Sequence, residues 1–257
     1  MSESRQISVL VTNDDGIYSE GIEYLAESLL KIAKVTVVAP DVERSAVGHA
    51  ITLNNPLRVE EVYKSGRLFG YAVNGTPADC VKIGINAIMK EKPDIIISGI
   101  NAGANVGTDI IYSGTVSAAI EGSIMGCCSA AISVSKKKKP YYFSAIEYTL
   151  KIVDILSQKQ FPKVLLNINV PSSPLSEIKG IRLTRQGKMQ FRDYFDKRED
   201  PSGRIYYWLT GEQMDSEPGD DIDSNALRDG YVSITPIHYN LTDNNLLKDL
   251  KNWNFGG

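Results

Sequence analysis

Short runs rich in Val and Ile recur along this chain, and segments with helical periodicity separate most of them. The runs cover residues 7–12, 35–39, 95–98, 130–134 and 164–170. They mostly lack polar alternation, which is typical of strands that are covered on both faces. Strands that alternate with helices indicate a parallel, doubly wound α/β sheet, and no other feature of the sequence restricts the fold as strongly.

The helical pattern is clearest over residues 20–33, where apolar residues gather on one face and Ser19 occupies the expected N-cap position. Thr76 should cap the next helix, which begins at Pro77. The remaining helical segments are expected over residues 77–89, 115–125 and 144–156.

Two regions interrupt the alternation. Residues 50–73 predict two or three strands around Lys64-Ser65-Gly66, and residues 189–195 and 205–210 predict a long hairpin around Asp200-Pro201-Ser202-Gly203. From the pattern alone, this hairpin is equally compatible with an arm that packs on another subunit and with an extra edge of the sheet. No linker divides the chain, so we expect one domain over 1–257, with a protruding hairpin at about 187–212 and a C-terminal extension at about 236–257.

Composition excludes several classes of protein. Of 257 residues, 42% are hydrophobic, which supplies a sizeable core and argues against disorder. The 28 Lys and Arg residues against 31 Asp and Glu residues give a formal charge of −3, so a nucleic-acid polymer is not an expected partner. The basic run 136–139 lacks aromatic neighbours and is interpreted as a solvated loop.

The three cysteines form neither a disulfide framework nor a CxxC motif. The sequence begins without the pattern of a signal peptide, and no apolar stretch approaches the roughly 20 residues that span a bilayer. We therefore expect a cytoplasmic protein with no membrane partner.

In an open parallel sheet, ligands bind beyond the carboxyl ends of the strands. Three of the predicted strands are followed there by carboxylates, a hydroxyl or amides. These segments are Asn13-Asp14-Asp15-Gly16, residues 40–45 with Ser45, and residues 99–107 with Asn101 and Asn105.

Asp14 and Asp15 are adjacent carboxylates at the end of a buried strand, where they repel each other and resist desolvation. A divalent cation relieves both costs, and oxygen ligands suit Mg²⁺, Mn²⁺ or Ca²⁺. The alternative is an Asx turn in which Gly16 takes a positive φ. Ser45 and Asn101, as further oxygen ligands from neighbouring loops, favour the metal.

Residues 99–115 form a loop rich in Gly and Asn that runs into a helix. The free N–H groups at a helix start bind phosphate, which makes Asn101, Asn105, Ser113, Gly114 and Thr115 candidate phosphate contacts. The alternative is a turn-rich connection that ends in an ordinary Ser or Thr cap.

Competing motifs are missing from the sequence. It contains no GxxxxGK[ST], no GxGxxG after the first strand and no GxSxG. Aspartyl-phosphate phosphatases carry Asp-x-Asp, whereas here the two aspartates are adjacent. With only His49 and His238, a zinc site or a Ser-His-Asp triad is not expected. His238 is interpreted as structural, and the role of His49 is left open.

Taken together, five segments closely resemble the SurE family, the survival-protein 5′-nucleotidases. They are VTNDDGI (11–17), APDVERSAVGHAIT (39–52), NGTPADCV (74–81), SGINAGANVGTDIIYSGTVSAAIEG (98–122) and DGYVSITP (229–236). One departure is Ala46, where many relatives carry Gly.

The resemblance implies a Rossmann-like fold and a phosphoric monoester hydrolase that converts nucleoside 5′-monophosphates to nucleoside and phosphate. It implies one divalent ion per subunit, Mg²⁺ or Mn²⁺, held by Asp14, Asp15, Ser45 and Asn101. The catalytic set is then Asp14, Asp15 and Asn101. The family also forms dimers or tetramers through C-terminal elements, which favours the intersubunit arm. Action on 3′-nucleotides or short polyphosphate, a covalent aspartyl mechanism and a non-catalytic nucleotide sensor remain alternatives.

Overall fold

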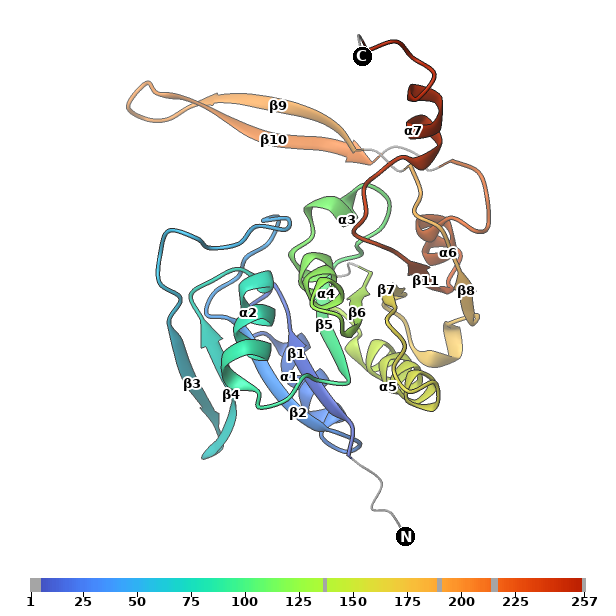
Figure 1. Cartoon of the computed structure of the whole chain (residues 1–257). Helices are drawn as coiled ribbons and strands as arrows, with labels where there is room; N and C mark the ends of the chain where they lie inside the picture. Colours follow the sequence, from blue (N-terminus) through green and yellow to red (C-terminus); the bar gives the residue numbers. More distant parts are fainter. Residues whose placement is uncertain (1–5, 136–137, 189–190, 214–216, 256–257) are drawn as a thin grey trace.

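A computed structural model describes residues 6–135, 138–188, 191–213 and 217–255. Its centre is a nine-stranded sheet with the order β3-β4-β2-β1-β5-β6-β7-β11-β8 (Figure 1). The strands are β1 (Ser8–Thr12), β2 (Lys34–Pro40), β3 (Val59–Lys64), β4 (Arg67–Val73), β5 (Ile95–Ala102), β6 (Cys128–Val134), β7 (Leu165–Val170), β8 (Ile181–Leu183) and β11 (Val232–Pro236).

The six strands from β4 to β7 in this order are parallel, whereas β3 and β11 run antiparallel to their neighbours β4 and β7. From β1 the chain first builds outward through β2, then returns to place β5 on the other side of β1. The order of the strands therefore reverses between β1 and β5. A crevice for ligands forms at such a switch point, beyond the carboxyl ends of the strands.

Helices cover both faces of the sheet. On one face, α1 (Glu20–Leu29) and α5 (Tyr142–Gln158) pack over Val9 and Val11, and on the other, α2 (Pro77–Ile83) and α4 (Gly114–Ile124) pack over Leu10. Consecutive side chains of a strand point to opposite faces, so a strand covered on both sides must be apolar throughout. The shorter helices are η1 (Gly84–Ile88), α3 (Asp109–Tyr112), η2 (Leu175–Glu177), α6 (Asp223–Arg228) and α7 (Asn244–Leu250).

All five apolar runs form strands, and the predicted α/β class is confirmed. The helix predicted over 20–33 ends at Leu29, and the Ser19 hydroxyl does not cap it, because this hydroxyl accepts a hydrogen bond from Asn13 Nδ2 at 2.8 Å. The helix predicted over 77–89 changes at Gly84 into a π-helical turn. Thr76 caps α2 as predicted, in a reciprocal capping box with Asp79.

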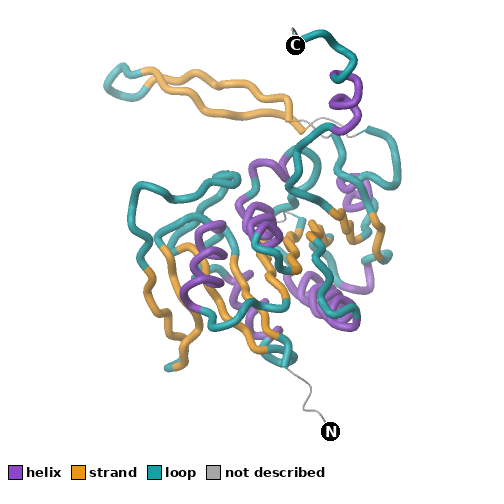
Figure 2. The backbone as a smooth tube through the Cα atoms, in the orientation of Figure 1, coloured by secondary structure: helices purple, strands orange, loops and turns teal. Residues whose placement is uncertain are grey.

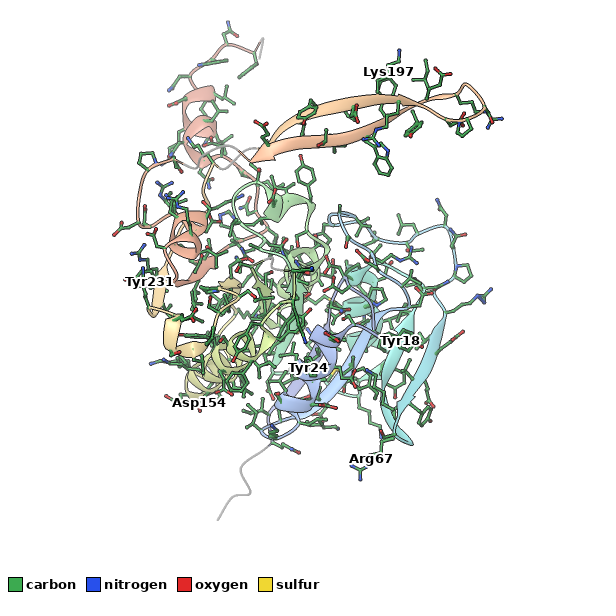
Figure 3. The ribbon with its side chains drawn as sticks, turned by 180° about the vertical axis from the view of Figure 1, so that it is seen from behind. Tyr18, Tyr24, Arg67, Asp154, Lys197 and Tyr231 are labelled. Atoms are coloured by element: carbon green, nitrogen blue, oxygen red, sulfur yellow. The ribbon has the colours of Figure 1, made fainter. Side chains whose placement is uncertain are left out.

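Residues 50–73 contribute two strands, β3 and β4, to the sheet. The predicted hairpin is present as β9 (Phe191–Glu199) and β10 (Ile205–Gln213), which form a separate two-stranded sheet that projects from the body (Figures 1 and 2). Residues 189–190 of the predicted hairpin, and 136–137 of the basic run, lie outside the described residues. Seen from behind, Lys197 stands on the projecting hairpin, clear of the body (Figure 3). None of the described helices is long and apolar enough to cross a membrane.

Candidate functional site at the carboxyl ends of the strands

The loops after β1 and β2 are bonded to each other. Ile17 N donates to Pro40 O at 2.9 Å, and Arg44 N donates to Asp14 O at 2.7 Å. Gly16 has the positive φ, +92°, that the Asx-turn alternative expects, but Asn13 Oδ1 accepts no hydrogen bond in the described structure, and Asn13 Nδ2 instead donates to Gly16 O at 2.9 Å. A Cβ on Gly16 would lie 3.2 Å from the carbonyl carbon of Val42. The turn and the meeting of the two loops are therefore one structure.

Asp14 is held by the start of α4. The carboxylate is almost fully buried, and it accepts a hydrogen bond from Thr115 N at 3.0 Å and another from Thr115 Oγ1. Ser113 Oγ caps the helix by accepting from Val116 N at 3.1 Å. A Cβ on Gly114 would lie only 2.8 Å from Asp14 Cβ, so only glycine permits this approach.

Asp15 lies next to the end of β5, because the backbone N–H of Ala102 bonds to its carboxylate. Asn101, one residue earlier on β5, is half-buried and donates through Nδ2 to Gly103 O at 2.8 Å. Ser45 is exposed and donates to Glu43 Oε1 at 2.6 Å. Since Arg44 N bonds to Asp14 O, Ser45 follows immediately after the contact between the two loops.

The site carries uncompensated negative charge. Burial, and then the charge of Asp14, raises the pKa of Asp15 from 3.8 to about 6. Burial also raises the pKa of Asp14, although the hydrogen bonds from Thr115 oppose the change. Glu43 adds further repulsion to both carboxylates. Within the described residues neither aspartate forms an ion pair, so the site favours a cation.

Asn105 lies one strand further along the sheet. Its Nδ2 donates to Ser133 Oγ at 2.8 Å, its N donates to Asn169 Oδ1 at 2.8 Å, and its carbonyl accepts from Asn167 and Asn169. These bonds attach the loop to the tips of β6 and β7. Both donors of Thr115 are likewise accepted by Asp14. The phosphate contacts predicted for Asn105 and Thr115 thus stay predictions, made at groups that already have protein partners.

A second attachment of this loop involves residues that sequence reasoning missed. Asp223, fully buried at the start of α6, accepts from Gly107 N at 2.8 Å and from Gly187 N at 3.0 Å. Gln186 Nε2 donates to Gly107 O at 2.8 Å. The stem of the hairpin is therefore fastened to the Gly-rich loop.

Glu121 was also missed, although it is the one charged residue in the sequence of α4 and lies among small residues. Its carboxylate is 2.8 Å from His49 Nε2 and 2.7 Å from Lys82 Nζ. This gives His49 a partner. His238, by contrast, is exposed after β11.

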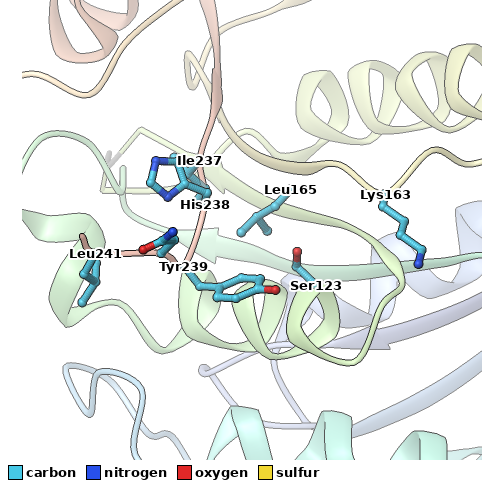
Figure 4. A pocket seen from close by; sticks show the side chains of 8 residues that line it. Ser123, Lys163, Leu165, Ile237, His238, Tyr239 and Leu241 are labelled. Carbon is cyan, nitrogen blue, oxygen red and sulfur yellow. The ribbon is translucent and has the colours of Figure 1, made fainter. Parts of the chain in front are cut away.

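An open groove of about 810 Å³ lies elsewhere (Figure 4). Leu165, which begins β7, lines it, so the groove is at the amino ends of the parallel strands. The other lining residues are Ser123, Lys163, Ile237, His238, Tyr239, Asn240 and Leu241. None of the residues predicted for catalysis belongs to it.

The chain is similar to known proteins over almost its whole length. The family model described as "Survival protein SurE" matches residues 9–193. A protein named 5′-nucleotidase SurE from Kosmotoga olearia is 50% identical, covering 98% of this chain and 100% of its own length. Another protein of that name, from Syntrophobacter fumaroxidans, is 46% identical and covers 96% and 99%.

A solved structure agrees with these relatives. The crystal structure of SurE protein from Aquifex aeolicus superposes with a TM-score of 0.83 at 40% identity, covering 95% of this chain and 98% of that chain. The resemblance that the motifs indicated is confirmed: this chain belongs to the SurE family.

Proposed function

We propose that this chain is a divalent-metal-dependent 5′-nucleotidase, which hydrolyses nucleoside 5′-monophosphates at the site between β1 and β5. The observation that carries the proposal is the pair of adjacent aspartates, buried Asp14 and half-buried Asp15, with raised pKa values and no cationic partner among the described residues. The names of the relatives support the same activity.

The donor set fits a hard divalent ion. We assign Asp14, Asp15, Ser45 and Asn101 as its ligands, and Mg²⁺ or Mn²⁺ as the ion, with one ion per subunit. The described residues hold no cluster of three or more His, Cys, Asp or Glu side chains suited to a metal, so hydroxyl and amide oxygens must complete the set. The neighbouring Asn13 also supports a bound cation, since its Oδ1 is a buried acceptor without a hydrogen-bond partner in the described structure.

When bound, the ion supplies a Lewis acid for a phosphoryl oxygen and lowers the pKa of a coordinated water. The protein supplies position and hydrogen-bond donors. Asn101, Ser113 and the N–H of Gly114 at the start of α4 are the groups that we assign to the phosphoryl oxygens. Thr115 fixes both oxygens of Asp14, which leaves Asp15 as the carboxylate better placed to accept the proton of the attacking water.

The test is a panel of nucleoside 5′- and 3′-monophosphates and short polyphosphate, assayed with Mg²⁺ or Mn²⁺ and after chelation. We expect hydrolysis of 5′-monophosphates that stops with EDTA and returns with metal. Activity indifferent to EDTA would indicate a covalent aspartyl mechanism. Binding of nucleotide without hydrolysis would indicate a sensor.

Asp14→Asn provides the first prediction. Removing this carboxylate should lower activity by about a thousandfold or more, the scale seen when a main source of transition-state charge stabilisation is lost. Circular dichroism should show an intact fold, because the side chains have nearly the same shape. Asp154→Asn, an exposed change on α5, is the matched control and should retain full activity. An active Asp14→Asn protein would refute the metal site.

We further propose that the hairpin binds a second copy of this chain. Its exposed residues include Phe195, Trp208 and Leu209, with 65%, 58% and 60% of their surface accessible. The C-terminal segment adds exposed Trp253 and Phe255. Aromatic patches of this kind on a projecting arm are typical of interfaces.

A further inference from the structure

The loop between β2 and β3 carries Ser45, and a charged cluster attaches that loop to α4. Glu121 of α4 has only 4% of its side chain exposed, and it pairs with His49 of the loop and with Lys82 of α2. Burial alone would raise the pKa of Glu121, but the hydrogen bonds from His49 and Lys82 outweigh it and lower that pKa. A buried carboxylate that stays ionised requires such partners.

Residues 44–49 run along α4 from its first turn. A Cβ on Gly114 would lie 3.2 Å from Arg44 O, and Glu121 stands seven residues after Gly114. Seven residues are about two turns, or about 10 Å along the helix axis. The loop therefore contacts α4 in two places, at Gly114 through Arg44 and at Glu121 through His49. Ser45 directly follows the first of these contacts.

Other bonds fix the loop within this stretch, at Gly48, and after it, at Ala50 and Thr52. Gly48 N donates to Tyr112 O at 3.0 Å, Ala50 O accepts from Thr76 Oγ1 at 2.7 Å, and Thr52 Oγ1 donates to Asp79 at 2.7 Å. Ser45 itself bonds through its side chain to Glu43 of the same loop. Among the described side-chain hydrogen bonds and ion pairs of residues 44–49, the one that reaches α4 is His49 to Glu121.

We propose that His49 is a positioning residue, which acts through Glu121 to hold Ser45 against the helix that also holds Asp14. Helix α4 then positions two of the assigned ligands, Asp14 from the loop after β1 and Ser45 from the loop after β2. This inference rests on the proposed function, because the position of Ser45 matters only if its hydroxyl is a ligand.

The experiment compares His49→Ala with His49→Gln, whose amide can replace the Nε2 donor. In metal-free protein, His49→Ala should speed hydrogen exchange at residues 46–49 without affecting the rest of the chain. Calorimetric binding of Mn²⁺ should weaken about tenfold, the effect expected when a group that orients a ligand is removed. At saturating Mn²⁺, kcat should change less than the KM for the nucleotide. His49→Gln should restore both the wild-type hydrogen exchange at residues 46–49 and the wild-type affinity for Mn²⁺.

Glu121→Ala removes the same pair from the helix side together with the Lys82 contact, so its effects on exchange and affinity should be at least as large as those of His49→Ala, and the double variant should be no worse than Glu121→Ala alone. Lys64→Gln removes an ion pair of similar length, 2.6 Å to Glu23, away from this loop, and is the control. If wild-type protein binds no Mn²⁺, the proposed function fails. If it binds Mn²⁺ and both His49→Ala and Glu121→Ala bind it equally well, the positioning inference is overturned. A loss of kcat with unchanged exchange and affinity would also overturn it.

Discussion

The Asp14 site and the β9–β10 hairpin differ in which side chains are exposed to solvent. At the site, the Asp14 carboxylate is buried and is held by backbone and side-chain donors of another element. On the hairpin, large apolar groups are exposed, and the two strands bond to each other rather than to the main sheet. A buried charge calls for a counter-ion, whereas an exposed aromatic patch calls for a protein surface.

The two regions are nevertheless joined. The stem of the hairpin reaches the Gly-rich loop through Gln186 and Asp223, and that loop leads into α3 and α4. Substitutions in each region separate the properties of the site from those of the hairpin.

Among the substitutions that compare these two regions, Gly114→Ala should have the largest effect. The added methyl group would lie 2.8 Å from Asp14 Cβ and 3.0 Å from Oδ2, so either the aspartate or the helix must shift. A displaced charge-stabilising group lowers kcat by about a hundredfold or more. Gly126→Ala is the control: φ is +82° there, at the far end of α4, but its methyl group would meet nothing within 4 Å. It should destabilise the protein without lowering kcat, and an equal loss of kcat in both variants would contradict the assignment.

Trp208→Ala tests the hairpin. If the exposed indole is a central contact between copies, its loss raises the dissociation constant by about thirtyfold, which corresponds to about 2 kcal/mol. Sedimentation velocity over a dilution series measures the constant. Lys151→Ala, an exposed change on α5 away from the hairpin, should leave it unchanged. A wild-type chain that sediments as a monomer at all concentrations would remove the basis of this proposal.

In metal-free protein, the contribution of Asp15 to the free energy of unfolding should decrease as pH rises from about 4 to 6. Its pKa is raised in the folded state from 3.8 to about 6, so in this window the native state binds more protons than the unfolded state. The contribution is on the order of 1 kcal/mol, since Asp15 is partly exposed and screened. Thermal unfolding of wild type and Asp15→Asn across this range gives the difference, which should vanish if the proposed Asp15 effect is wrong.

Affinity for a metal ion should have the opposite pH dependence and increase as pH rises. The ligands must be deprotonated to bind a cation, so affinity for Mn²⁺ should fall as pH drops through about 6. Calorimetry at two pH values checks this, and a pH-independent affinity would exclude Asp15 as a ligand.

Ala46→Gly should have the smallest effect. Ala46 has φ +55°, a left-handed conformation that costs an alanine about 1 kcal/mol more than a glycine. Part of the gain is offset by the greater freedom of glycine in the unfolded chain. We expect a stabilisation of about 0.5 kcal/mol, measured by urea denaturation. Ser65→Gly, at φ +50° in the β3–β4 turn, should gain as much, and it should not alter Mn²⁺ affinity because it lies away from the assigned ligands.

The sequence predicts the strands and the site for the same reason. Apolar runs such as 95–98 are local patterns that predict strands covered on both faces, and chain order then places Asp14 and Asn101 at neighbouring strand ends. Contacts that depend on side-chain packing were not predictable. Glu121 lies 72 residues from its partner His49, and Asp223 lies 116 residues from Gly107. Such pairs leave no local pattern, although a lone charge among the small residues of α4 was a usable signal.

The hydrogen bonds from Thr115 to Asp14 also bear on selectivity among anions. A helix start is ordinarily open to any small anion, but here the protein's own carboxylate already accepts donors of that first turn. Free sulfate, chloride or phosphate therefore meets negative charge rather than an open anion hole. Under the proposed mechanism, the site binds an anion only when the divalent cation is also bound. The affinity of the site for that cation therefore affects how readily the phosphate product is released.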